Sequence, residues 1–85
     1  MRPTKSSQEK LQAILKSQGY TIRYERGNFQ GGYCIVHDQK TIVINKFHPI
    51  EGKINSMIDI IKALDIVEDQ LTEDQKKVVD KLKTD

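Results

Sequence analysis

The stretch GNFQGGYCIVHDQKTIVIN, residues 27–45, decides the fold of this chain because it carries the strongest β signal in the sequence. Three glycines lie in its first six positions and permit backbone angles that other residues avoid. Two apolar, β-branched runs follow, Tyr33–His37 and Thr41–Ile44. No glycine lies in the turn between them, so the pattern predicts a β-hairpin whose loop is longer than two residues.

The residues before this hairpin predict one helix and one further strand. Ser6-Ser7-Gln8-Glu9 is typical of a capping box, and an apolar stripe at helical spacing follows it, so we expect a helix over about Ser7–Gln18. Gly19 supplies a left-handed stop. Apolar and polar residues then alternate over Tyr20–Arg26, which predicts a half-buried antiparallel strand.

The residues after the hairpin predict two helices. The first begins with Pro49 at its first position, and its broad apolar stripe consists of Ile50, Ile54, Met57, Ile58, Ile61 and Leu64. Ile60 lies off this stripe. After a connector over Asp65–Leu71, the segment Thr72-Glu73-Asp74-Gln75 forms a second capping box and begins a short amphipathic helix.

The predicted order is therefore α-β-β-β-α-α in one small α+β domain, residues 1–85, with a three-stranded antiparallel sheet and helices on one face. We expect the core to join Ile54, Met57, Ile58 and Ile61 with Ile22, with Ile35 or Val36, and with Val43 or Ile44. Only 36% of the residues are hydrophobic and 6% are aromatic, so the core is small. A partner protein or a second copy in a homodimer would add burial.

Composition also limits the compartment and the partners. The first ten residues lack the apolar core of a signal peptide, and no apolar run approaches the roughly 18 residues of a membrane span. We therefore expect a cytoplasmic protein with no membrane partner. The net charge of +2 divides into +5 over residues 1–50 (eight Lys/Arg, three Asp/Glu) and −3 over residues 51–85 (six Lys, nine Asp/Glu). This excess is too small to argue for nucleic acid by itself.

No set of residues in the sequence forms a recognisable catalytic or metal motif. Cys34, the only cysteine, and His37 are expected on opposite faces of one strand, and a zinc site with His48 would need ligands from unfavourable positions. The spacing of Gly27, Gly31 and Gly32 matches neither the P-loop motif G-x-x-x-x-G-K-[ST] nor the dinucleotide-binding motif G-x-G-x-x-G. No Asp or Glu pairs with a His or Lys in a pattern that suggests acid–base catalysis, so these carboxylates are expected on a solvated face. We therefore expect no enzyme activity, no metal and no cofactor.

The order α-β-β-β-α resembles that of the double-stranded RNA-binding domain. That resemblance implies a lysine cluster at the start of the final helix, facing duplex phosphates. Here the corresponding segment is Pro49-Ile50-Glu51-Gly52-Lys53, with Lys46 as the nearest further cation. The resemblance therefore implies at most weak nucleic-acid binding.

A second resemblance rests on Gly31-Gly32-Tyr33, on Ile42-Val43-Ile44-Asn45, and on the Pro49 linker that leads into an apolar helix. This arrangement resembles the ImmA/IrrE-type zincin metallopeptidases, in which the helix bears H-E-x-x-H. The corresponding segment here is Ile58-Asp59-Ile60-Ile61-Lys62, without the zinc histidines. The resemblance implies a non-catalytic relative. Residues 27–45 are also similar to segments of small uncharacterised bacterial proteins.

Two hypotheses for function follow. The first is a small non-enzymatic protein-interaction domain, and the second is a nucleic-acid-binding module that uses Arg23, Arg26, Lys40 and Lys46. For the first, the candidate anchor is Phe29, because the glycine-rich loop around it offers little apolar cover for a ring. The alternative is that this ring folds back under the loop and covers one end of the sheet. The candidate binding surface consists of Arg26, Asn28, Phe29, Gln30 and Lys46.

Overall fold

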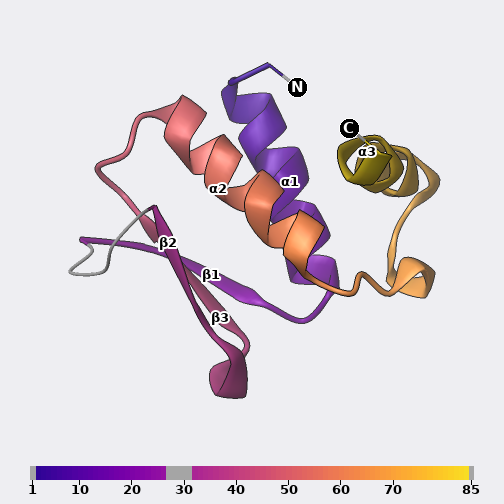
Figure 1. Cartoon of the computed structure of the whole chain (residues 1–85), viewed down its shortest axis with the longest axis horizontal. Helices are drawn as coiled ribbons and strands as arrows, with labels where there is room; N and C mark the ends of the chain where they lie inside the picture. The colour runs from indigo at the N-terminus through magenta and orange to yellow at the C-terminus, as the bar shows by residue number, and fades with distance from the viewer. Residues whose placement is uncertain (1, 27–31, 85) are drawn as a thin grey trace.

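The structure, a computed structural model, describes residues 2–26 and 32–84. Its elements follow the predicted order (Figure 1): α1 (Lys5–Ser17), β1 (Thr21–Glu25), β2 (Tyr33–Val36), β3 (Thr41–Asn45), α2 (Ile50–Ala63) and α3 (Glu73–Thr84), with single 3-10 turns η1 (His37–Gln39) and η2 (Glu68–Gln70). The α+β class is therefore confirmed. The hairpin loop is longer than two residues, as predicted, because η1 and the left-handed Lys40 lie between β2 and β3.

The sheet is mixed, so the prediction of an antiparallel sheet is wrong. The strand order is β1-β3-β2. β3 pairs antiparallel with β2 but parallel with β1, with Thr21 opposite Thr41 and Glu25 opposite Asn45. The antiparallel expectation assumed that strands adjacent in sequence are neighbours in the sheet. Instead the chain leaves β1 and returns as β2 on the far side of β3, at the same end of the sheet.

The central place of β3 has a physical reason in its sequence. β3 reads Thr-Ile-Val-Ile-Asn, and Ile42 and Ile44 are fully buried. A strand with partners on both sides satisfies its backbone groups completely, and β-branched residues suit that position. β1 carries Arg23 and Glu25 instead, and charged side chains are typical of an edge strand.

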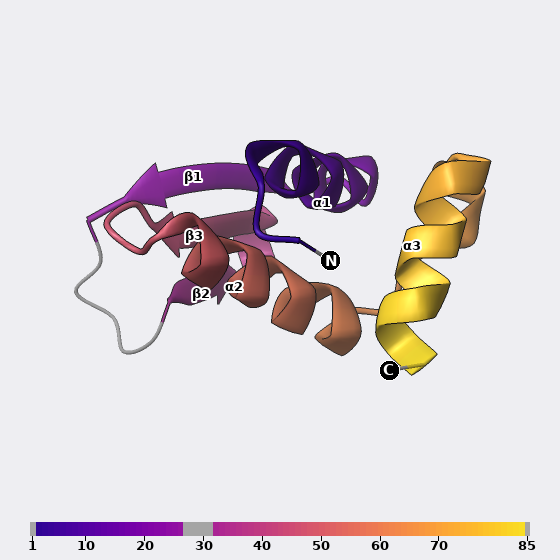
Figure 2. The ribbon, with the colours of Figure 1, turned by 90° about the horizontal axis from the view of Figure 1, so that it is seen from above.

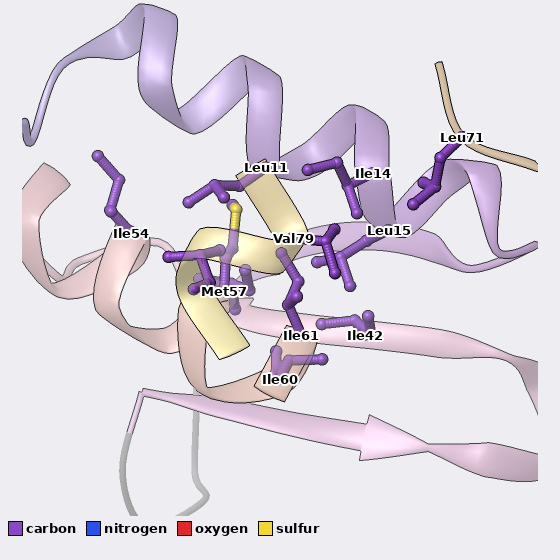
Figure 3. Packing of buried hydrophobic residues seen from close by; sticks show 12 residues of the cluster. Leu11, Ile14, Leu15, Ile42, Ile54, Met57, Ile60, Ile61, Leu71 and Val79 are labelled. Carbon is purple, nitrogen blue, oxygen red and sulfur yellow. The ribbon is translucent and has the colours of Figure 1, made fainter. Parts of the chain in front are cut away.

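The helices form a layer on one face of this sheet, as predicted. α1 and α2 lie side by side over the sheet, whereas α3 packs against the helix layer at the end remote from the loop between β3 and α2 (Figure 2). The core lies between these layers (Figure 3). It consists of Leu11, Ile14, Leu15, Ile42, Ile44, Ile54, Met57, Ile60, Ile61, Leu71, Val79 and Leu82.

The buried side of α2 is rotated relative to the predicted stripe. Ile60 is fully buried, although it was expected off the stripe, and Ile58 is only partly buried against the core. Ser56, one turn before Ile60, is also buried and faces Gly32 at the start of β2. The sheet therefore covers the Ser56 side of the helix, which the apolar pattern alone does not reveal.

On the sheet, side-chain alternation selects one residue from each predicted pair. Ile44 is buried and Val43 is not, and Ile35 packs against the core whereas Val36 does not. Ile22 packs against the core as predicted. The opposite face of the sheet has no helix over it among the described residues and carries Cys34, Val36, Val43 and Arg23.

Helix ends match the sequence signals in part. The Thr72 box is confirmed, because the Thr72 hydroxyl accepts from Gln75 N–H at 3.2 Å and the Gln75 side chain accepts from Thr72 N–H at 2.9 Å. Gly19 has φ +88°, as its role as a stop requires. The Ser6 box is wrong: Thr4 caps α1 and accepts from Ser7 N–H at 3.1 Å. Pro49 lies one position before α2, as its N-cap.

Candidate functional site: an exposed aromatic ring at the sheet end

One end of the sheet gathers residues from three separate parts of the chain. β1 ends there, β3 ends beside it, and β2 begins on the other side of β3 (Figure 1). The loop from β3 to the N-terminus of α2 starts at the same place. Because β1 and β3 are parallel, Arg26 and Lys46, which directly follow these two strands, lie next to each other.

Backbone hydrogen bonds hold the turn after β3 in place. Lys46 N–H donates to the Glu25 carbonyl at 3.0 Å and so extends the pairing of β3 with β1. The Asn45 side-chain oxygen accepts from Phe47 N–H at 3.0 Å, which is the bond of an Asx turn. His48 N–H donates to the Asn45 carbonyl at 3.2 Å. The backbone of Phe47 is therefore well anchored.

The side chain of Phe47 nevertheless points into solvent. It is 63% exposed, the largest exposure among the large hydrophobic residues that the structure describes. The Arg26 guanidinium lies 5.5 Å from the ring centroid and the Lys46 ammonium 5.2 Å. Both distances are within the range of cation–π attraction. We call Arg26, Lys46 and Phe47 together the Phe47 patch.

The Phe47 patch contains two of the five residues predicted for the binding surface. Arg26 and Lys46 do meet around an aromatic ring, but that ring is Phe47. Asn28, Phe29 and Gln30 lie outside the described residues. The sequence did contain a signal for Phe47, because a large ring after Asn45-Lys46 and before Pro49 belongs to no apolar stripe.

The four cations proposed for nucleic-acid binding do not form one stripe. Arg23 pairs with Glu25 at 2.7 Å, so its charge is balanced locally. Lys40 lies at the other end of β3 from Lys46, 5.7 Å from the Tyr20 ring centroid. Only Arg26 and Lys46 come together. A third cation, Lys53, lies in the first turn of α2, and its ammonium is 5.7 Å from the centroid of the Tyr24 ring.

His48 packs behind the patch against two glycines. A Cβ atom on Gly52 would meet the His48 Nδ1 at 2.9 Å, and one on Gly32 would meet the His48 Cε1 at 3.0 Å and the Ser56 Oγ at 2.5 Å. The Ser56 hydroxyl donates to the Gly52 carbonyl at 2.9 Å. Because Gly32 and Gly52 have no side chains, His48 in the loop between β3 and α2 can pack against both α2 and the start of β2.

Tyr24 connects β1 to α1 near the same end of the sheet. The Gln8 amide donates to the Tyr24 hydroxyl at 2.9 Å, and that hydroxyl donates to the Gln12 side-chain oxygen at 2.6 Å. Burial raises the pKa of the Tyr24 phenol, and the Gln8 hydrogen bond opposes this with a smaller lowering of the pKa. The folded chain therefore favours the neutral phenol.

This shift in the Tyr24 pKa predicts a loss of stability in alkali. Below the ordinary pKa of 10.0 the stabilisation is fully present, and it is lost as the pH rises towards the higher folded pKa, because the unfolded chain releases the phenolic proton first. We expect the free energy of unfolding to fall more steeply above about pH 10 in the wild type than in Tyr24→Phe. Urea unfolding at a series of pH values measures the two slopes; equal slopes would contradict this prediction.

The residues considered for catalysis do not converge. Cys34 faces the open side of the sheet from β2, whereas His37 is exposed in η1, just beyond the strand to which the prediction assigned it. Within residues 2–26 and 32–84, no three His, Cys, Asp or Glu side chains are grouped to hold a metal ion. At the zincin-like positions, Ile58 packs against the core and Lys62 is exposed.

A groove of about 570 Å³ lies between α1 and α3, away from the Phe47 patch. It exists because α3 packs mainly on α2 and leaves a gap beside α1. Its lining consists of Lys10, Ala13, Ile14, Asp74, Gln75, Lys77 and Val78. The charged side chains of this lining are two lysines and one aspartate, and it includes neither His nor Cys.

Comparison with known proteins adds no relative. No protein-family model matches the chain, and no curated protein or solved structure matches it. Among the described helices, none has the length and apolar character that crossing a bilayer requires.

Proposed function

We propose that this chain is a small, non-enzymatic protein-interaction domain of the cytoplasm that binds a partner protein through the Phe47 patch. The observation that carries the proposal is the ring of Phe47, which is 63% exposed on an anchored turn between two cations. When a partner protein covers a solvent-exposed ring, the removal of its apolar surface from water makes the free energy of binding more favourable. Aromatic residues and arginine are also the types that dominate interface energetics.

The anchored backbone supports this proposal in a second way. Binding costs less entropy when the contacting residue is already held in place. Asn45 holds the Phe47 amide, and Lys46 is held through Glu25, so the turn needs little ordering when a partner arrives. The partner we expect offers an apolar pocket for the ring and carboxylates opposite Arg26 and Lys46, since complementary charge gives specificity.

Phe47→Ala tests the proposal, with Val67→Ala as the matched control. Val67 is also an exposed hydrophobic residue, at 55%, but it lies far along the chain, next to η2. We expect Phe47→Ala to weaken binding by about 2 kcal/mol or more, roughly 30-fold, because hot-spot truncations have that size. Thermal stability should change by less than about 1 kcal/mol, as for other surface substitutions.

The measurement has two steps. An affinity pull-down from the native host with mass spectrometry identifies proteins that the wild type and Val67→Ala retain and Phe47→Ala loses. Titration of the purified partner by calorimetry then gives the three dissociation constants. Equal constants for all three chains would sink the proposal. A stability loss of about 3 kcal/mol in Phe47→Ala would instead show a structural role for the ring.

The second candidate is a weak nucleic-acid-binding module, and one observation favours it. An exposed ring between two cations also suits base stacking beside phosphate contacts. Against it, Arg23 is paired and Lys40 is remote, so few free cations remain at this end. We expect duplex RNA and single-stranded DNA to bind no tighter than micromolar at about 150 mM salt. Nanomolar binding that Lys46→Glu abolishes would favour this candidate.

A further inference from the structure

The outer edge of β2 carries a row of backbone hydrogen-bonding groups that have no strand partner among residues 2–26 and 32–84. β2 is an edge strand in the order β1-β3-β2. Its four residues, Tyr33–Val36, are all partly buried and none is charged. Edge strands are usually protected from pairing by charges, proline or bulges. The other edge, β1, has that protection in the Arg23–Glu25 ion pair, whereas residues Tyr33–Val36 of β2 include neither a charge nor a proline.

The hydrogen-bond pattern shows which groups of β2 face outward. Asn45 N–H donates to the Gly32 carbonyl at 2.9 Å, so Gly32 and Asn45 form a hydrogen-bonded pair of the antiparallel ladder. Because such pairs alternate along a ladder, the backbone groups of Cys34 and Val36 also point towards β3. The backbone N–H and C=O groups of Tyr33 and Ile35 therefore point away from β3, towards the open edge of the sheet.

From this pattern we infer that β2 pairs antiparallel with β2 of a second copy, so that two chains form one continuous sheet. A two-fold axis perpendicular to the sheet relates the copies and keeps the helices of both on the same face. Tyr33 of each copy then lies opposite Ile35 of the other. Each of these two pairs exchanges both of its outward N–H and C=O groups, so every outward group of Tyr33 and Ile35 finds a partner.

Charge and side-chain chemistry favour a second copy as the occupant. No charged residue of β2 meets its own counterpart across the axis, so two identical strands approach without repulsion. On the helix-covered face the pairing joins Tyr33 with Ile35, a combination of aromatic and β-branched residues that stabilises neighbouring strands. A shift of the axis to Ile35 would pair Tyr33 with His37, which lies outside the strand in η1.

The same register places Cys34 on the two-fold axis. Cys34 meets Cys34 of the second copy in a non-hydrogen-bonded pair, with Cα atoms about 4.5 Å apart, on the face without helices. That separation is within the range that a disulfide requires. The native cysteine is therefore a reporter of the interface. This self-association goes beyond the proposed function, because the Phe47 patch contributes none of the pairing residues.

Mild oxidation of the full chain with copper phenanthroline tests the register. We expect the wild type to form a covalent dimer that thiol reductants reverse. The matched control is Val43→Cys combined with Cys34→Ser, because Val43 is the cross-strand partner of Cys34 on the same face. Three strand spacings, about 14 Å, separate the two copies of this position, too far for a disulfide. Equal cross-linking of both chains would overturn the inference.

Sedimentation equilibrium of the reduced chain tests the pairing without cross-linking. The wild type should approach twice the mass of one chain as its concentration rises. Cys34→Lys should remain monomeric, because it places like charges opposite each other across the axis. Its circular dichroism should match the wild type. A wild type that stays monomeric up to about 1 mM, or a folded Cys34→Lys chain that still dimerises, would overturn the inference.

Discussion

Ile60→Ala is expected to lower the free energy of unfolding by about 2–5 kcal/mol. The Ile60 side chain is fully buried in the layer between α2 and the sheet (Figure 3). Truncation removes buried methyl groups and leaves a cavity that a close-packed core fills only in part. Because the free energy of unfolding of small domains is only about 5–15 kcal/mol, the variant should lose a large part of its stability.

Ile58→Ala is the matched control, since it makes the same chemical change on the same helix. Ile58 is only partly buried, so its truncation should cost clearly less than that of Ile60. Urea unfolding followed by circular dichroism, at one fixed protein concentration, gives both values and avoids a contribution from self-association. A larger loss for Ile58→Ala would show that the predicted stripe, and not the rotated one, faces the core.

Gly32→Ala is expected to cost about 1–3 kcal/mol, because it adds a methyl group where there is no room. The new Cβ would meet the Ser56 Oγ at 2.5 Å and the His48 Cε1 at 3.0 Å. Ser56 does not yield easily. Ser56 is buried and its hydroxyl is bonded to the Gly52 carbonyl, and Gly32 itself accepts a hydrogen bond from Asn45.

A double-mutant cycle separates this steric cause from a general effect of alanine on the backbone. Ser56→Ala removes the oxygen that lies nearest to the new methyl group. If crowding is the cause, Gly32→Ala should cost less in the Ser56→Ala background than in the wild type, with a coupling free energy of at least about 0.5 kcal/mol. Additive losses, measured by thermal melts of the four chains, would assign the cost of Gly32→Ala to the backbone instead.

Local signals predicted the elements well because each depends on residues a few positions apart. The Thr72 box, the Gly19 stop and the longer hairpin loop all follow from short stretches, and all are present. The predicted Ser6 box was wrong, because Thr4 caps the helix instead. Thr4 and Ser6 are both good caps, and the choice of Thr4 adds two residues to the start of the predicted helix.

The candidate site was predictable only in part, because its members lie far apart in sequence. Arg26 and Lys46 belong to the predicted binding surface, and in the structure they flank an aromatic ring. The identity of that ring as Phe47 depends on the turn that Asn45 closes and on the parallel neighbour of β3. The pattern of one strand contains no information about which strand lies beside it.

The sequence by itself determined the element order, the α+β class and the residue types of the core, since these depend on periodicity and local chemistry. Only the tertiary structure decided the parallel pairing of β1 with β3, the rotation of α2 that buries Ile60, and the meeting of Arg26 and Lys46 around Phe47. The physical reason is that strand order and helix rotation minimise exposed surface and unpaired backbone groups over the whole chain. No short stretch of sequence determines how much surface and how many backbone groups the whole chain leaves exposed.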